Sequence, residues 1–422
     1  MSSIKIFGGK QLKGELEIQG SKNAALPIIA ATILNKGITK LKNCPKILDV
    51  FHMINILEEL GCKTSWEGNT VYVDSTEINR TTVPEVSVRM MRSSILYLGA
   101  LLGRCREVSI AYPGGCSIGK RPIDYHLDAL MKMNVNQKSS EDDGGTIHCK
   151  SERIIGNDIF LEFPSVGATQ NIILTAVLSE GVTRIFNGAR EPEVKALCNY
   201  LVKAGAKIRG EGTSLIEIEG VKELNDVEFE LLPDRIVAGT YMVAAAATMG
   251  DVTLINTPNK QLDTIIQLLK RTGCVIKEGE ACLKVSCDTR PSPINILKTQ
   301  PYPGFPTDMQ SQMMTLLCIA KGKSTIVESI FESRYQNIDE LRKMGANLEV
   351  EGKKASIEGV GKLNSARVKA HDLRGGAALV IAGLIAEGET VVENARFIQR
   401  GYEDICRDFS LLGADTTIFT EI

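Results

Sequence analysis

The stretch Ile172-Ile-Leu-Thr-Ala-Val-Leu-Ser-Glu-Gly181-Val-Thr-Arg-Ile-Phe-Asn187 runs from an apolar helical segment through a glycine into a β-branched strand. The same order of apolar helix, glycine and strand recurs elsewhere in the chain, once in a degenerate form that contains Gly103 and the segment 108–110. Self-similarity at a fixed period is typical of repeat architectures and takes precedence over local predictions. The sequence therefore predicts six copies of one structural unit. The four remaining copies lie at residues 31–43, 245–256, 319–327 and 385–394.

A second pattern follows each of these stretches: a helix that ends in Leu-x-x-x-Gly, with Phe409 in place of the leucine in the last unit, and then a pair of strands. A glycine at the position after a helix is ordinary punctuation, but its return about every 70 residues is not. In one unit the glycine is missing, and the segment Met133-Asn134-Val135 stands in its place. The glycines of the other units are Gly61, Gly205, Gly273, Gly345 and Gly413.

Each unit thus reads strand, helix, strand, helix, strand, strand. The alanine-rich helices at residues 28–34, 172–177 and 379–385 lack a polar face, which predicts that they are buried on all sides. We expect an α/β fold in the form of a two-domain inside-out α/β barrel. It has six repeats, three in each domain, with the helices inside and the sheets outside.

The chain length of 422 residues exceeds one ordinary core and favours two domains. We expect an N-terminal domain of residues 21–230, and a C-terminal domain of residues 1–20 plus 231–422. The first strand pair, within residues 4–18, precedes the first helix, and should therefore complete the C-terminal domain. The chain would then cross between the domains twice.

Composition excludes several functional classes. Net charge is −2, so no broad basic surface for nucleic acid is indicated. The eleven cysteines include no Cys-x-x-Cys pair, which argues against a zinc site or a disulfide framework and favours a reducing cytoplasm. The N-terminus lacks the apolar region of a signal peptide, and apolar stretches such as residues 242–249 are too short to span a bilayer. We expect a cytoplasmic protein with no nucleic-acid partner and no membrane insertion.

The segment 112–126 has a composition unlike the repeats. Gly114, Gly115 and Gly119 predict neither helix nor strand between the prolines at 113 and 122. Cys116 lies in its middle, with Lys120 and Arg121 close behind. A thiol that is exposed and near positive charge is chemically useful. The alternative is an ordinary surface loop that carries a cysteine.

The junctions between strand and helix carry most of the remaining unusual residues. Ser21, Ser165, Thr307 and Asp372 are candidate N-caps, and helix N-termini present free N–H donors to anions. Parallel helices would bring these ends together as a site for a substrate with several negative charges. The alternative is that the caps are only caps and the arginines lie on the surface. The junctions are residues 20–23, 89–92, 163–167, 232–235, 305–308 and 371–374.

These features together resemble the enolpyruvyl transferase family over essentially the whole chain, including its EPSP synthase-like fold. The cysteine loop is typical of the branch that acts on UDP-N-acetylglucosamine, and is absent from the 5-enolpyruvylshikimate-3-phosphate synthases. The residues that carry the resemblance are Ser21-Lys-Asn-Ala24, Pro113-Gly-Gly-Cys-Ser-Ile-Gly-Lys-Arg-Pro122, Leu232-Pro-Asp-Arg235, Phe305-Pro-Thr-Asp-Met-Gln310 and Arg400-Gly-Tyr-Glu403.

The resemblance implies transfer of the enolpyruvyl group of phosphoenolpyruvate to the 3′-hydroxyl of UDP-N-acetylglucosamine, with release of phosphate, as the first committed step of peptidoglycan synthesis. It places the active site in the cleft between the domains, with the Cys116 loop as a lid. Addition followed by elimination needs a proton donor and a base, but no metal or organic cofactor. The implied catalytic residues are Cys116 as proton donor and nucleophile, Asp308 as base, and Lys22 and Arg400.

The resemblance also implies the substrate contacts. Phosphoenolpyruvate would be bound by Lys22, Arg121 and Arg400, with Arg334 and Arg374 as further cations. Asp372 would hold Cys116 or a neighbouring cation. The UDP-sugar would contact Asn23, Arg92, Arg121, Pro122, Ile123, Asp124, Tyr125, Ser165, Val166, Gly167, Asp308 and Ile330.

The sequence leaves several alternatives open. Asp308 and Asp372 can be read as N-caps alone, Arg334 as a surface arginine, and His126 as a structural histidine. Phe163 stands where some family members have a lysine, which puts one nucleotide contact in doubt. Rival functions are a 5-enolpyruvylshikimate-3-phosphate synthase, a non-catalytic UDP-sugar-binding paralogue and, more remotely, an RNA-end-processing enzyme.

Overall fold

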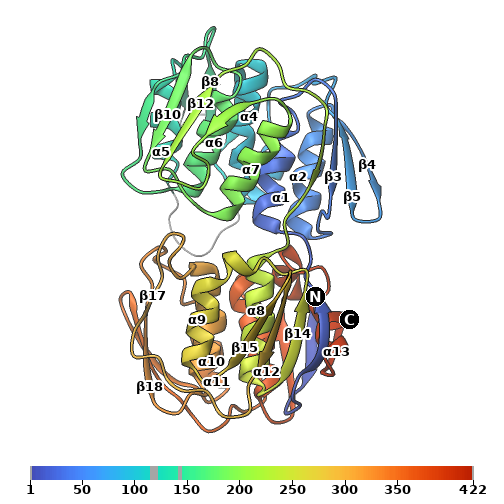
Figure 1. The fold of residues 1–422 in the computed structure, drawn as a ribbon, viewed down its shortest axis with the longest axis vertical. Helices are drawn as coiled ribbons and strands as arrows, with labels where there is room; N and C mark the ends of the chain where they lie inside the picture. Colours follow the sequence, from blue (N-terminus) through green and yellow to red (C-terminus); the bar gives the residue numbers. More distant parts are fainter. Residues whose placement is uncertain (1, 115–121, 141–144, 421–422) are drawn as a thin grey trace. The chain divides into compact units, whose positions relative to one another are not determined.

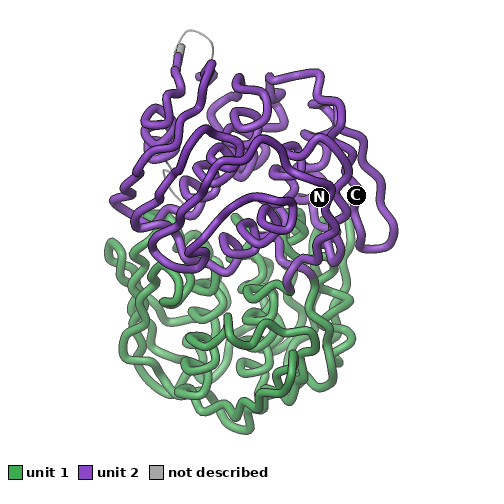
Figure 2. The backbone as a smooth tube through the Cα atoms, turned by 45° about the horizontal axis from the view of Figure 1, so that its top comes forward, with its two compact units in different colours: residues 1–19, 117–120, 233–422 green, residues 20–116, 121–232 purple. Residues whose placement is uncertain are grey.

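The computed structural model describes residues 2–114, 122–140 and 145–420. Within them the chain forms two compact units, one from residues 20–114 and 122–232 and the other from residues 2–19 and 233–420 (Figure 2). Cys116 and Arg121 lie outside the described residues.

The third repeat shows the common architecture. Its sheet has the order β11-β12-β10-β9, in which β9 runs parallel to β10 and the other neighbours are antiparallel. The predicted order of strands and helices is confirmed. In chain order the elements are β9 (Asp158–Phe160), α6 (Val166–Ala176), β10 (Val182–Phe186), α7 (Pro192–Lys203), β11 (Lys207–Arg209) and β12 (Leu215–Glu219).

The first two repeats complete the same unit. The first forms the sheet β13-β3-β5-β4 and takes its parallel edge strand from the far end of the unit. The second has three strands in the described residues, and a single bridge from Thr82 to Ser109 marks the place of the fourth. The elements are α1 (Lys22–Ala31), β3 (Ile38–Lys42), α2 (Leu48–Glu59), β4 (Lys63–Glu67), β5 (Thr70–Asp74) and β13 (Val227–Glu230), then α3 (Glu85–Met90), η1 (Arg92–Ile95), α4 (Leu96–Cys105), β6 (Glu107–Ala111), α5 (Asp124–Lys132), β7 (Asn136–Ser140) and β8 (Thr146–Lys150).

The other unit holds repeats four to six, with the sheets β15-β16-β14-β2, β17-β18-β20-β19 and β21-β22-β1-β23. Its elements are β2 (Lys13–Glu17), α8 (Arg235–Ala247), β14 (Asp251–Ile255), η2 (Asn259–Gln261), α9 (Asp263–Arg271), β15 (Val275–Gly279), β16 (Cys282–Ser286), β17 (Leu297–Lys298), η3 (Thr307–Met309), α10 (Gln310–Leu317), β18 (Lys323–Val327), α11 (Ile338–Lys343), β19 (Asn347–Glu351), β20 (Lys354–Glu358), β21 (Arg367–Lys369), α12 (Leu373–Ile385), β22 (Glu389–Glu393), η4 (Ala395–Arg400), α13 (Ile405–Leu411), β23 (Asp415–Thr420) and β1 (Ser2–Phe7).

The two N-terminal strands do not pair with each other, although the sequence suggested a strand pair. β1 lies between β22 and β23, antiparallel to both, whereas β2 is parallel to β14 in another sheet. The physical reason is that the sixth repeat lacks its last strand and the fourth lacks its first. One N-terminal strand fills each vacancy.

The helices that follow the parallel edge strands form the core of each unit. Every residue of α8 and α10 is buried, and α12 is buried up to its last residue. α10 packs against both α8 and α12, while α4 packs against α6 and α1 in the other unit (Figure 1). The fold class with buried helices and outer sheets is confirmed, and each sheet is open, so the described strands close no barrel.

The turn after the second helix of each repeat explains the recurring glycine. Gly205, for example, has a φ of 107°, in the left-handed region that favours glycine. Asn134 occupies the same position in the second repeat with a φ of 66°, and its Nδ2 donates to the carbonyl of Arg153 at 2.9 Å. Asparagine is one of the few other residues that adopt this conformation readily.

No helix in the described part of the chain has both the length and the apolar character that crossing a membrane requires.

Candidate functional site

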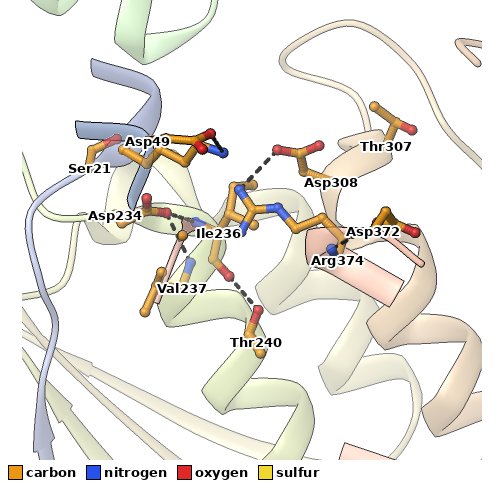
Figure 3. A network of polar contacts seen from close by, with 12 residues as sticks. Ser21, Asp49, Asp234, Ile236, Val237, Thr240, Thr307, Asp308, Asp372 and Arg374 are labelled. Atoms are coloured by element: carbon orange, nitrogen blue, oxygen red, sulfur yellow. Dashed lines mark hydrogen bonds and ion pairs between the residues drawn. The ribbon is translucent and has the colours of Figure 1, made fainter. Parts of the chain in front are cut away.

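Three junctions of the unit that holds repeats four to six come together around Asp308. Asp308 belongs to η3 and Arg374 to the first turn of α12, and their side chains point toward one another (Figure 3). Asp234 caps α8 by accepting from the backbone N–H groups of Ile236 and Val237, at 2.8 and 3.0 Å. The N-termini of packed neighbouring helices thus place charged groups within reach of each other, as the junction pattern predicted.

Asp308 is clamped between two arginines. Its Oδ1 accepts from Arg334 Nη2 at 3.0 Å, and its Oδ2 accepts from Arg374 Nη2 at 3.1 Å. The arginine side chains are each 3% exposed and the Asp308 side chain is 28% exposed. Charge-assisted bonds to both oxygens fix the carboxylate, while one part of it stays accessible.

This geometry settles two of the open alternatives. Asp308 is no N-cap, because η3 already begins at Thr307, and α10 follows Met309 without a side-chain cap bond. Arg334 is buried, so the surface interpretation is wrong. The prediction of Thr307 as an N-cap is also wrong, since Pro306 occupies the cap position of η3.

The Thr307 side chain has a different role. Its Oγ1 donates to Glu328 Oε2 at 2.9 Å, and its carbonyl accepts from Arg334 Nε and Nη2 at 3.3 and 3.2 Å. Glu328 is 1% exposed, and its Oε1 also accepts from the backbone N–H of Ile330 at 2.8 Å. Glu328 was not among the predicted site residues, and its only sequence signal is a carboxylate that directly follows the strand Lys323–Val327.

Arg374 sits in a fully buried environment. Burial lowers the pKa of its guanidinium, but attraction to Asp308, Tyr402 and Asp234 outweighs burial and raises the pKa above the ordinary value. The guanidinium carbon lies 6.0 Å from the centroid of the Tyr402 ring. Arg374 Nη1 has no hydrogen-bond partner among the described residues. The Tyr402 side chain also hydrogen-bonds to this guanidinium, and Nη1 remains a buried donor that an anionic oxygen can satisfy.

The other predicted site residues of this unit are Asp372, Arg400 and Ile330. Asp372 is the N-cap of α12 and accepts from the backbone N–H groups of Arg374 and Gly375, at 2.9 and 3.0 Å. The structure thus shows its capping role. Arg400 is the half-buried last residue of η4, two residues before Tyr402. Ile330 is half-buried.

In the other unit, Lys22 begins α1 beside a buried carboxylate. Its Nζ lies 2.8 Å from Asp49 Oδ2 on α2, and the two side chains are 11% and 2% exposed. Ser21 caps α1, as predicted, by accepting from the N–H of Ala24 at 3.4 Å. Asn23 is half-buried. Asp49 was not predicted as a partner of Lys22, because it lies 27 positions away in the sequence on another helix.

The second junction contacts the segment after the cysteine loop. Arg92 Nη2 donates to the carbonyl of Pro122 at 3.2 Å. Ile123 is buried, α5 begins at the exposed Asp124, and Tyr125 packs half-buried against the core. The structure therefore brings Arg92 together with the segment 122–125.

The third junction joins this region through a histidine. Ser165 caps α6 by accepting from the N–H of Ala168 at 3.4 Å, and the half-buried Val166 and Gly167 form the first turn. A Cβ added to Gly167 would lie 3.1 Å from His126 Cε1. His126 Nδ1 is 2.7 Å from Asn171 Nδ2 on α6. His126 is thus a buried residue that joins α5 to α6, which is the structural alternative.

Phe163 is 40% exposed at the start of the third junction. The predicted catalytic Cys116 and the predicted phosphate contact Arg121 lie outside the described residues. Among the described residues, no group of three His, Cys, Asp or Glu side chains is arranged to hold a metal ion.

Comparisons with known proteins agree on one family. The pattern of the EPSP synthase (3-phosphoshikimate 1-carboxyvinyltransferase) family matches residues 6–409. The chain is 50% identical over 415 residues to UDP-N-acetylglucosamine 1-carboxyvinyltransferase 2 of Caldanaerobacter subterraneus, covering 98% of this chain and 99% of that protein. It is 46% identical over 416 residues to UDP-N-acetylglucosamine 1-carboxyvinyltransferase of Clostridium botulinum, with the same coverage.

Solved structures show the same fold at lower identity. The enolpyruvyl transferase NikO from Streptomyces tendae superimposes with a TM-score of 0.90 at 23% identity, covering 100% of this chain and 99% of that chain. EPSP synthase from Acinetobacter baumannii superimposes with a TM-score of 0.76 at 18% identity, over the full length of both chains.

Proposed function

Because this chain belongs to the EPSP synthase family, we propose that it is an enolpyruvyl transferase that joins phosphoenolpyruvate to UDP-N-acetylglucosamine. The enolpyruvyl group is transferred to the 3′-hydroxyl of the sugar and phosphate is released. Relatives that are 44–50% identical over nearly the whole chain bear the name of this reaction, UDP-N-acetylglucosamine 1-carboxyvinyltransferase. The reaction is the first committed step of peptidoglycan synthesis.

The observation that carries this proposal is the clamp around Asp308. Both substrates are anions, and the buried Arg374 keeps an N–H group without a partner among the described residues. A phosphate or carboxylate oxygen would complete that guanidinium. The adjacent carboxylate of Asp308 is held in place by Arg334 and Arg374, as a base that abstracts a proton from a bound hydroxyl must be.

The chemistry is an addition followed by an elimination. Cys116 gives a proton to C3 of phosphoenolpyruvate, the 3′-oxygen attacks C2, and Asp308 takes the hydroxyl proton. In the second stage C3 loses a proton and phosphate leaves, which restores the double bond. The thiolate of Cys116 can also add to C2, which gives a covalent adduct with the protonated substrate. These roles rest on the family resemblance.

The other site residues divide by substrate. Lys22, Arg121 and Arg400 bind the phosphate of phosphoenolpyruvate, with Arg334 and Arg374 as further cations, while Asp372 orients Arg374 by capping its helix. The UDP-sugar contacts Asn23, Arg92, Pro122, Ile123, Asp124, Tyr125, Ser165, Val166, Gly167 and Ile330, together with Arg121 and Asp308. The contact between Arg92 and Pro122 supports part of this set.

The proposed compartment is the cytoplasm. The sequence has no Cys-x-x-Cys pair, as suits a reducing environment.

The test is phosphate release from phosphoenolpyruvate with each acceptor in turn. We expect turnover with UDP-N-acetylglucosamine and none with shikimate 3-phosphate. Turnover with shikimate 3-phosphate alone would make the chain a 5-enolpyruvylshikimate-3-phosphate synthase. Absence of phosphate release in a single-turnover experiment, despite UDP-sugar binding, would identify a non-catalytic binding protein.

Asp308→Asn tests the base directly. The amide keeps the shape of the side chain but cannot take a proton, so kcat should fall by about 10² to 10⁴. Binding of UDP-N-acetylglucosamine, measured by calorimetry, should change by less than about threefold, because the chemical step is affected rather than ground-state binding. Asp339→Asn is the control, since Asp339 also pairs with an arginine but is 80% exposed on α11. Near wild-type turnover of Asp308→Asn would place the base elsewhere.

A further inference from the structure

In four repeats an asparagine with a left-handed backbone directly follows the inner strand that runs parallel to the edge strand, which we call the central strand. Asn43, Asn187, Asn256 and Asn394 have φ values of 55°, 57°, 57° and 59°. Each donates its side-chain N–H to the carbonyl of the residue that directly follows the parallel edge strand. This bond fixes the point at which the edge strand leaves the sheet for the junction. The carbonyls, in the same order, belong to Leu231 at 3.0 Å, Leu161 at 2.8 Å, Ile18 at 3.4 Å and Ala370 at 3.3 Å.

Two repeats depart from this pattern. In the second, β6 continues directly into Tyr112, which begins the segment that contains Cys116. In the fifth, β18 continues into Glu328, whose N–H donates to the carbonyl of Lys353 at 2.9 Å without a left-handed residue. Departures from a repeat are expected where function overrides local regularity. The fifth repeat is the one that carries Asp308.

Glu328 replaces the missing amide with a buried carboxylate. Its Oε1 accepts from Thr299 Oγ1 at 2.9 Å, which links the central strand to the end of the edge strand. The same oxygen accepts from the N–H groups of Ile330 and Phe331 at 2.8 and 3.1 Å, and Oε2 accepts from Thr307 Oγ1 at 2.9 Å. A buried carboxylate needs such partners, so it holds all four groups in one arrangement.

A short path of contacts leads from Glu328 to the clamp. Thr307 Oγ1 is bound to Glu328, and the Thr307 carbonyl is bound to Arg334. Arg334 in turn donates to Asp308 Oδ1, and Asp308 directly follows Thr307 in the chain. The Glu328 carboxylate thus bonds to two of the three segments that carry the clamp, residues 307–308 and residues 328–334.

We infer that Glu328 is a positioning residue, which acts through Thr307 to orient Asp308 and Arg334 for the reaction. This inference rests on the proposed function of Asp308 as the base. A base displaced by about 1 Å loses on the order of 10² in rate. Substrate binding depends on many other groups, so the effect should appear in kcat and leave KM nearly unchanged.

Thr307→Val is the main test variant, because it removes the hydroxyl and keeps the branched shape. We expect kcat to fall by about 10- to 100-fold, with KM for both substrates within about threefold of wild type. Thr307→Ser keeps the hydroxyl, and should recover at least about a third of the wild-type kcat. Thr272→Val is the matched control: it removes a buried hydroxyl that donates to the carbonyl of Leu269 at 2.8 Å, at the C-terminal end of α9 and outside the three junction segments of the same unit.

Glu328→Gln closes a double-mutant cycle with Thr307→Val. If the two residues act through one bond, the double variant should lose little more than the worse single variant. Additive losses, a Thr307→Val kcat within about twofold of wild type, or equal losses in the Thr272→Val control would overturn the inference. A rise in KM that matches the loss in kcat would also overturn it, since it would indicate a direct substrate contact.

The wild type is assayed first with UDP-N-acetylglucosamine and with shikimate 3-phosphate, and the variants follow on whichever acceptor it uses. Failure of the UDP-sugar to react then counts only against the proposed substrate. The cycle on the accepted substrate decides the role of Glu328. Asp308→Asn activity near that of wild type would remove the premise that Asp308 is the base, and with it this inference.

Discussion

The ammonium of Lys22 is held against the buried carboxylate of Asp49 at 2.8 Å. Lys22→Ala should cost about 3–5 kcal/mol of stability in urea unfolding, since it leaves a buried carboxylate without its ammonium partner. The same substitution should also weaken the binding of phosphoenolpyruvate by about one to two decades in Kd, and the binding of UDP-N-acetylglucosamine much less. Lys207→Ala is the control, because Lys207 pairs with Glu219 at an exposed site. Equal weakening of both ligands would show that Lys22 does not act as a phosphate contact.

Single cysteines differ sharply in reactivity because burial opposes the charged thiolate. Burial raises the pKa of Cys198, Cys318 and Cys406 to about 12, and that of Cys62 and Cys149 to about 11. A raised pKa keeps these five thiols protonated, and thus weakly nucleophilic, until the pH approaches those values. Peptide mass spectrometry after labelling of the native protein at pH 8 should find them unmodified, whereas labelling in urea should modify them.

Fosfomycin, an epoxide that resembles phosphoenolpyruvate, should then alkylate Cys116 in the native protein. The sequence places this cysteine near Lys120 and Arg121, which favours the thiolate. Mass spectrometry of the protein treated at pH 8 should locate the adduct in the peptide that contains residue 116. An adduct on one of the five buried cysteines would contradict both the proposed role of Cys116 and the burial argument.

At the scale of elements, the turn at Asn134 shows how a repeat tolerates change. Its positive φ suits glycine and asparagine but costs other residues about 1–2 kcal/mol. Asn134→Ala should therefore lower the free energy of unfolding by about 2–3 kcal/mol, since it also loses the bond to the Arg153 carbonyl. Asn134→Gly should be within about 1 kcal/mol of wild type, because relief of strain offsets the lost bond. Equal losses in chemical denaturation would show that the backbone conformation is not the cause.

At the scale of the whole molecule, the two units differ in how the chain completes them. The sheets of one unit use only strands from within residues 20–232, and so does its core. The other unit needs β1 as an inner strand and β2 as an edge strand, and its core includes Ile4, Ile6, Leu12, Leu16 and Ile18. Residues 20–232 therefore contain every described strand and core residue of their unit, whereas residues 233–422 lack strands and core residues that the N-terminal segment supplies.

A fragment of residues 20–232 should fold alone, whereas a fragment of residues 233–422 should not. The second lacks the strand between β22 and β23, so two sheet edges and a row of core positions would be exposed. Circular dichroism during urea unfolding should show a cooperative transition for the first fragment only. Residues 233–422 joined through a flexible linker to residues 1–19 should recover such a transition. A cooperative transition of the unlinked fragment 233–422 would contradict this account.

Much of the architecture follows from the sequence because repeats and apolar helices are local signals. The recurring glycines mark left-handed turns, and the segment 379–385 has no polar face and is buried as far as Leu384. The caps Ser21, Ser165 and Asp372 were also predictable, since a cap bonds to the N–H groups two or three residues ahead. The pairing partners of β1 and β2 were not, because they lie hundreds of residues away.

The candidate site divides in the same way. The sequence by itself determined which residue types stand at each junction, and through them the family and the reaction. Only the tertiary structure decided what each side chain bonds to. Asp308 bonds to Arg374 across 66 positions, Lys22 pairs with Asp49, and Glu328 takes the place of the asparagine that bonds to the end of the edge strand in four other repeats. The physical reason is that capping, turn and burial signals act over a few residues along the chain. Ion pairs and buried carboxylate contacts arise only when packed helices and sheets bring distant junctions together.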